Sequence, residues 1–215
     1  MANLFSAFDP CTGILSLNWL STLIMFLIIP HNYWLLTNKN NFVIGLMMNY
    51  LNSELKLIMP YKGSLLMMMT LFIMILYNNI MGLLPYIFTS SSHLLFSLSI
   101  ALPIWLSLMI YGWINKTNSM FMHLVPVGTP GILMPFMVII ETISNLIRPG
   151  SLAVRLTANM IAGHLLMTLL GSNVSGYLLI LSLTVFIILM LFESAVALIQ
   201  SYVFMTLMNL YSSEI

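Results

Sequence analysis

The sequence predicts an all-α integral membrane protein with about five membrane-embedded helices, one interfacial amphipathic helix and a long, strongly tilted helical hairpin at the end. Composition indicates the class, because 60% of the 215 residues are hydrophobic and only 5% are charged. Soluble domains average about 25% charged residues, so this chain could not cover a water-exposed surface. Long apolar runs indicate the helices, and the last two exceed the ~20 residues that a vertical span needs.

Three runs of roughly membrane length precede the hairpin, all within a single membrane domain. They predict spans at residues 14–29, 64–84 and 94–114. Residues 40–59 mix asparagines and charges with apolar side chains at helical spacing, which predicts a helix lying in the membrane interface. Prolines and glycines interrupt residues 120–135, so we expect a loop or a pair of short turns there.

The hairpin is predicted at residues 135–170 and 177–211. At about 1.5 Å per residue, each run is longer than a ~30 Å hydrocarbon core, so each helix must tilt, bend or break. The Pro149-Gly150 pair is the expected bend in the first helix. A short, uncharged turn joins the two runs, which favours antiparallel packing.

The lysines predict the orientation. Lys39, Lys56 and Lys62 lie between the first two predicted spans, and Lys116 follows the third. Three crossings place all four lysines on one side, which the positive-inside rule makes the cytoplasm or the matrix of an organelle. The N-terminus is then expected on the opposite side, and the C-terminus on the side of the lysines.

The first hairpin helix carries a charge where membrane helices rarely have one. Arg155 lies in the middle of the run, and an arginine side chain stays protonated in a protein. A charge at mid-membrane costs between ~2.5 and ~17 kcal/mol, depending on the scale. On a helical wheel, five polar residues fall within about 40° of Arg155. They are Glu141, Ser144, Arg148, Ser151 and Asn159. Serines and asparagines alone would indicate helix–helix hydrogen bonds, whereas the charged residues favour a functional cavity.

A second polar group is predicted between the two hairpin helices. His164 lies near the face opposite Arg155, and the second helix offers Glu193, with Gln200 seven residues later. Histidine and glutamate both exchange protons once burial and neighbours shift them, so they form a candidate proton relay. The alternative is that His164 only hydrogen-bonds to a neighbouring helix.

The residues that other functions need are missing from the sequence. Cys11 is the only cysteine, which excludes a disulfide framework and a cysteine-based metal site. No glycine-rich phosphate loop and no pair of histidines at haem spacing occurs, and a net charge of +1 gives no case for nucleic acid. We therefore expect no cofactor, no metal site and no catalytic residue.

Four motifs together resemble the subunit a family of F-type ATP synthases. They are RPGSLAVRLTANMIAGHLL, ESAVALIQSYVF, ILYNNIMGLLPYIFT and HLVPVGTPGILMPFMVIIETISNLIRPGS. The resemblance covers nearly the whole chain and departs in the N-terminal third and in residues 171–176. His at position 164 and Glu at position 193 resemble the mitochondrial form, whereas bacterial relatives tend to carry the two residue types exchanged.

The resemblance implies a non-catalytic proton-channel subunit of the mitochondrial inner membrane. Its partners would be the c-ring, whose small hairpin subunits each carry one membrane carboxylate, the other F0 and peripheral stalk subunits, and lipid. Two offset aqueous half-channels would reach the ring from opposite sides, with Arg155 facing the ring carboxylate and blocking a direct leak. By this resemblance, His164, Glu193, Asn159 and Gln200 line the proton-inlet side, and Glu141 and Ser151 line the outlet side.

In a mitochondrial inner membrane, the orientation expected from the lysines puts the N-terminus in the intermembrane space and the C-terminus in the matrix. Two other functions remain compatible with the residues alone. A stand-alone secondary transporter or channel would usually show two related halves, and nothing before residue 120 repeats the hairpin. A structural subunit of a respiratory complex would give Arg155 no role.

Overall fold

The computed structural model describes residues 4–11, 17–30, 36–58, 62–84, 87–125, 128–172 and 179–214. This part of the chain forms helices and no strand, which confirms the predicted all-α class. Seven are α-helices: α1 Ile24–Ile28, α2 Lys39–Ile58, α3 Lys62–Gly82, α4 Leu94–Asn115, α5 Thr117–His123, α6 Met134–Ser172 and α7 Leu179–Glu214. Three are short 3₁₀ helices: η1 Leu4–Phe8, η2 Leu17–Leu23 and η3 Ser90–Ser92.

Four of the described helices, α3, α4, α6 and α7, are long and apolar enough to cross a membrane. They overlap the runs expected at residues 64–84, 94–114, 135–170 and 177–211. Within residues 120–135, the described part contains the end of α5 and then turns. The turn expected between α6 and α7 lies mostly outside the described residues.

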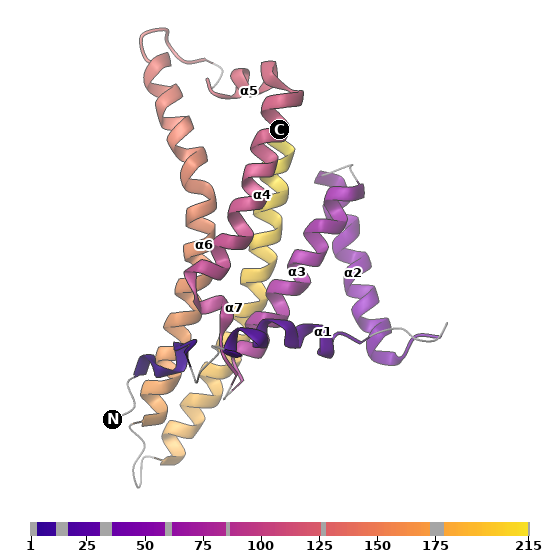
Figure 1. Cartoon of the computed structure of the whole chain (residues 1–215), viewed down its shortest axis with the longest axis vertical. Helices are drawn as coiled ribbons and strands as arrows, with labels where there is room; N and C mark the ends of the chain where they lie inside the picture. Colours follow the sequence, from indigo (N-terminus) through magenta and orange to yellow (C-terminus); the bar gives the residue numbers. More distant parts are fainter. Residues whose placement is uncertain are drawn as a thin grey trace.

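The predicted first span is described only in part. Residues 14–16 are not described, and residues 17–28 form η2 and α1, of seven and five residues. Together they extend roughly 20 Å, which is short of a ~30 Å hydrocarbon core. The Ser21 hydroxyl of η2 donates a hydrogen bond to the Phe88 carbonyl oxygen at 3.1 Å. This bond ties the segment to the α3–α4 connection, and α1 runs crosswise to the long helices (Figure 1).

Helix α2 packs against α3 and α7. It runs antiparallel to α3 (Figure 1), so its first residue, Lys39, lies about 25 Å along the helix from Lys56. We had expected all four lysines at one end of the molecule, but Lys39 lies at the other end of α2 from Lys56. An interfacial position for α2 stays a prediction.

Each of the two hairpin helices packs mainly against a different neighbour. Helix α3 packs mainly on α7, and α4 packs mainly on α6 (Figure 1). With 39 residues, α6 is about 58 Å long, nearly twice the thickness of a hydrocarbon core. It continues without a break through the buried Pro149, although proline removes one helical hydrogen bond. Because α6 is unbroken and longer than the hydrocarbon core, its tilt and a bend at Pro149-Gly150 both stay predictions.

The core lies where the four long helices meet. Its buried side chains include Phe72 and Ile75 of α3, Leu156 of α6, and Met205 and Met208 of α7. Lipid tails are as apolar as these side chains, so close van der Waals packing rather than exclusion of water must hold the helices together. Three fully buried alanines bring the backbones close: Ala101, Ala153 and Ala197.

We predict that Ala101→Leu destabilises the protein by about 1–3 kcal/mol, because the larger side chain must fit into a packed helix contact with no free space. The measurement is thermal stability of the assembled complex. Leu95→Phe is the control, since it also enlarges a side chain of α4 but at a position that is 73% exposed. Equal stability of the two variants would contradict close packing at Ala101.

Candidate functional site

Arg155 points away from the helices of this chain. Its side chain is exposed, and it has no ion pair or hydrogen bond among the residues that the structure describes. Its neighbours on this face of α6 are also exposed and mostly small: Ser151, Ala158 and Ala162. A permanent charge on an uncovered, small-residue face needs a counter-charge from outside the chain.

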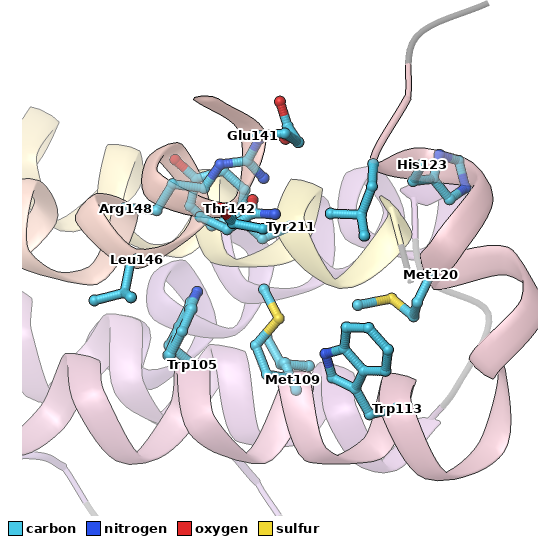
Figure 2. A pocket seen from close by; sticks show the side chains of 13 residues that line it. Trp105, Met109, Trp113, Met120, His123, Glu141, Thr142, Leu146, Arg148 and Tyr211 are labelled. Carbon is cyan, nitrogen blue, oxygen red and sulfur yellow. Dashed lines mark hydrogen bonds and ion pairs between the residues drawn. The ribbon is translucent and has the colours of Figure 1, made fainter. Parts of the chain in front are cut away.

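A cavity of about 480 Å³ lies between α4, α5, α6 and α7, before Arg155 along α6. We call it the Glu141 cavity. Its polar lining consists of Trp105, Trp113, His123, Glu141, Thr142, Asn145, Arg148 and Tyr211. Figure 2 shows Glu141, Arg148 and Tyr211 grouped together, with the tryptophans coming from α4. These side chains come from four helices, so the cavity depends on the fold and not on one motif.

The charges in the Glu141 cavity are paired within the chain. Arg148 Nη2 lies 3.5 Å from Glu141 Oε1, and the Arg148 guanidinium lies 4.9 Å from the centre of the Tyr211 ring. The first contact is an ion pair seven residues apart on α6, and the second is a cation–π contact with α7. The ion pair bears out the predicted stripe for these two residues, since they share a face of the helix.

A second cavity of about 500 Å³ lies between α6 and α7, beyond Arg155 along α6. We call it the Glu193 cavity. Its polar lining is Asn159, Glu193 and Gln200, and Leu83, just after α3, closes one side. The Glu193 side chain is only 8% exposed, and neither carboxylate oxygen has a hydrogen-bond partner in the described part of the chain. A buried carboxylate in this state is costly unless a water or a proton reaches it.

His164 lies beside this cavity rather than in it. Its ring contacts Phe8 edge-on, with the centres 5.9 Å apart, and lies within hydrogen-bonding reach of the Gly82 backbone. Its Nε2 atom is buried without a partner, and no ion pair joins it to Glu193 among the described residues. Glu193 lies against Gly163, the residue before His164, but no hydrogen bond or ion pair joins the two predicted relay residues in the described part of the chain. A proton passing between them would need a bridging water.

Three polar residues of the α3–α4 region were missed as functional candidates. Asn79 and Ser91 are completely buried, and His93 adjoins η3. The Asn79 amide, the Ser91 hydroxyl and His93 Nε2 all lack a hydrogen-bond partner in the part of the chain described here. Helix η3 contacts α3, α4 and α6, and Gly82 of α3 adjoins both Thr89 and Met160, so these groups lie near the part of α6 that carries His164. The Asn78-Asn79 pair, unusual in an apolar helix, was the available signal.

The order along α6 separates the two cavities. Arg155 comes seven residues after Arg148 and eight before Gly163, distances of roughly 10 and 12 Å along the helix. It lines neither cavity. Ser151 is also exposed and in neither cavity, and its hydroxyl donates a hydrogen bond to the Arg148 carbonyl oxygen at 2.9 Å. An unpaired charge therefore stands between two separate polar spaces.

Comparison with known proteins identifies the family of the chain. A family model described as ATP synthase A chain matches residues 14–213. Proteins named ATP synthase subunit a from Anopheles quadrimaculatus and Drosophila simulans are 58% identical over 224 and 222 residues, and one from Locusta migratoria is 55% identical over 225. Each match covers 100% of this chain and 99% of the relative. The resemblance seen in the sequence is confirmed, and the chain belongs to the ATP synthase A chain family, the proton-translocating subunit of F0.

Proposed function

We propose that this chain is a non-catalytic channel subunit in which Arg155 separates two offset proton half-channels and faces the carboxylates of a c-ring. The position of Arg155 carries the proposal: it is exposed, lacks a partner in the described residues and stands between two cavities. Neither a stand-alone transporter nor a structural subunit explains an outward-facing charge in this place.

The c-ring supplies the missing counter-charge. An uncompensated arginine on a lipid-facing surface would cost several kcal/mol, whereas a carboxylate within ~4–6 Å favours the charged form of both groups. The small side chains of Ser151, Ala158 and Ala162 leave room for a neighbouring helix to approach α6 closely. The ring carboxylate would therefore give up its proton as it reaches Arg155, and the same positive charge would repel protons moving directly between the cavities.

The proton-inlet path runs through the Glu193 cavity. Asn159 and Gln200 line this cavity together with Glu193, and His164 lies next to it. Asn79 and Ser91 extend the series of buried, unpartnered polar groups towards the α3–α4 connection. Waters bridging these groups would satisfy them and carry protons towards the ring.

The outlet path runs through the Glu141 cavity, from the ring towards the end of the molecule where α4 ends. Glu141 would accept the proton, with Arg148 and Tyr211 holding the surrounding charge in place. Ser151 would stand at the edge of this path, between the cavity and Arg155.

The protein is a multi-pass protein of the mitochondrial inner membrane, and two of its lysines support an orientation. Helix α3 begins, α4 ends and α7 ends at one end of the molecule (Figure 1), where Lys56 and Lys116 also lie, and this supports assigning that end to the matrix, although Lys39 lies at the other end of α2. The Glu193 cavity and the N-terminal segment then face the intermembrane space. Other F0 and peripheral stalk subunits, together with lipid, would cover the remaining exposed apolar side chains.

Arg155→Ala should stop both ATP synthesis and ATP-driven proton pumping, by at least about 100-fold, because the preorganised charge opposite the ring carboxylate is lost. Passive proton leak should persist or rise, because the barrier between the cavities is also lost. The measurement is proton flux and ATP synthesis in inner-membrane vesicles, with assembly checked on native gels. Arg155→Lys should fail as well, since lysine lacks the planar fork and can deprotonate when desolvated. An assembled alanine variant with normal synthesis would refute the proposed function.

Exchange of the relay residues tests the inlet path. His164→Glu and Glu193→His should each slow proton-driven synthesis about tenfold or more while the complex still assembles, because one proton-exchanging group is misplaced in each. The double exchange should recover part of the rate, as the bacterial pattern suggests. A double variant no faster than either single variant would show that the two residues act separately.

Orientation can be tested with the exposed natural cysteine, Cys11. A membrane-impermeant maleimide should label Cys11 when only the intermembrane-space face of the inner membrane is accessible. Lys116→Cys, combined with Cys11→Ser, should be labelled only in inverted vesicles. Detergent-solubilised complex provides the control that both thiols can react. Labelling of the Lys116→Cys variant from the intermembrane-space face would reverse the orientation.

A further inference from the structure

The carboxylate of Glu193 occupies the space that a side chain at position 163 would fill. Gly163 is a buried residue of α6, and a Cβ atom added to it would overlap Oε1 and the carboxyl carbon of Glu193. The two other described glycines within α6, Gly150 and Gly171, have nothing within 4 Å of such an atom. The close contact is therefore specific to this glycine and this carboxylate.

The backbone itself does not require glycine at this position. Gly163 lies within a regular helix, and the one described glycine with a positive φ is Gly128, in the turn before α6. Glycine in a helix interior costs about 1 kcal/mol relative to alanine. The space taken by the Glu193 carboxylate gives a reason for a residue that local helix propensity disfavours.

We propose that Gly163 is a positioning residue, which holds the Glu193 carboxylate inside the α6–α7 interface. This inference rests on the proposed inlet path. In this position the carboxylate lines the same cavity as Asn159 and Gln200. It also lies against Gly163, which immediately precedes His164. Proton transfer needs partners about 2.6–3.2 Å apart, or one bridging water, and a displacement of about 1 Å can cost roughly 100-fold in rate. Any side chain at position 163 would force such a displacement.

A shorter acid at position 193 should relieve the overlap that a methyl group at position 163 causes. Glu193→Asp withdraws the carboxylate by one methylene, towards α7, and so frees the volume beside residue 163. The expected result is a strong effect of Gly163→Ala when residue 193 is glutamate, and little effect when it is aspartate. This dependence separates positioning of a carboxylate from a general need for a small residue between two helices.

The experiment compares Gly163→Ala, Glu193→Asp and the double variant in inner-membrane vesicles. We expect Gly163→Ala to lower proton flux at least tenfold in assembled complex, and the double variant to match Glu193→Asp alone. Gly171→Ala is the matched control on the same helix, because its added methyl group meets open space, and it should leave flux unchanged. Gly163→Ala combined with Glu193→Ala should assemble without carrying protons, because it relieves the overlap but removes the acid.

Normal flux through assembled Gly163→Ala complex would overturn the inference, as would a double variant much slower than Glu193→Asp alone. If Gly163→Ala does not assemble, the double variant decides: assembly with the flux of Glu193→Asp supports positioning, and failure to assemble overturns it. Glu193→Gln tests the proposed inlet path separately. Normal flux in that variant would refute the relay, whereas blocked flux there together with normal flux in Gly163→Ala would refute only the role of Gly163.

Discussion

The arrangement depends on one charge that the chain does not neutralise. Arg155 has no partner in the described residues, and the two carboxylates that could have served lie elsewhere. Glu141 contacts Arg148, and Glu193 is buried between α6 and α7. Because neither acid contacts Arg155, its charge remains available to a carboxylate from outside the chain. An internal acid closer to Arg155 would lower the free-energy cost of its charge in the membrane. It would also weaken the attraction of Arg155 for an external carboxylate, because the charge would already be paired.

The length of α6 sets the separation of the two cavities on either side of Arg155. From Glu141 to Gly163, α6 rises about 33 Å, comparable with the ~30 Å hydrocarbon core. An upright helix could barely place both cavities inside the membrane, and it would place them one above the other. A tilted α6 would move the cavities apart sideways as well as in depth. A proton crossing the membrane would then have to travel with a moving partner past Arg155, which is the coupling that a rotary machine requires.

Much of this could be predicted from the sequence, because the membrane makes polar residues conspicuous. The apolar runs indicated α3, α4, α6 and α7, and the helical wheel placed Glu141 and Arg148 on one face, where the structure pairs them. What could not be predicted depends on contacts between distant segments. The hydrogen bond from Ser21 of η2 to Phe88 joins residues 67 positions apart, and the contact of Gly163 with Glu193 depends on the register of two long helices. Periodicity within one helix contains no information on that register.

The two cavities differ in how their polar groups are satisfied, and this difference suits opposite tasks. In the Glu141 cavity the charges have partners, so the chain alone holds them in place. Around the Glu193 cavity, several buried polar groups lack a hydrogen-bond partner among the described residues. They are the carboxylate oxygens of Glu193, Nε2 of His164 and the amide of Asn79. Buried polar groups without partners are costly and are normally satisfied by ordered water. In the proposed path, the inlet end therefore depends on water, and hence on protons, from outside, while the outlet end keeps its charges fixed beside the proposed point of release.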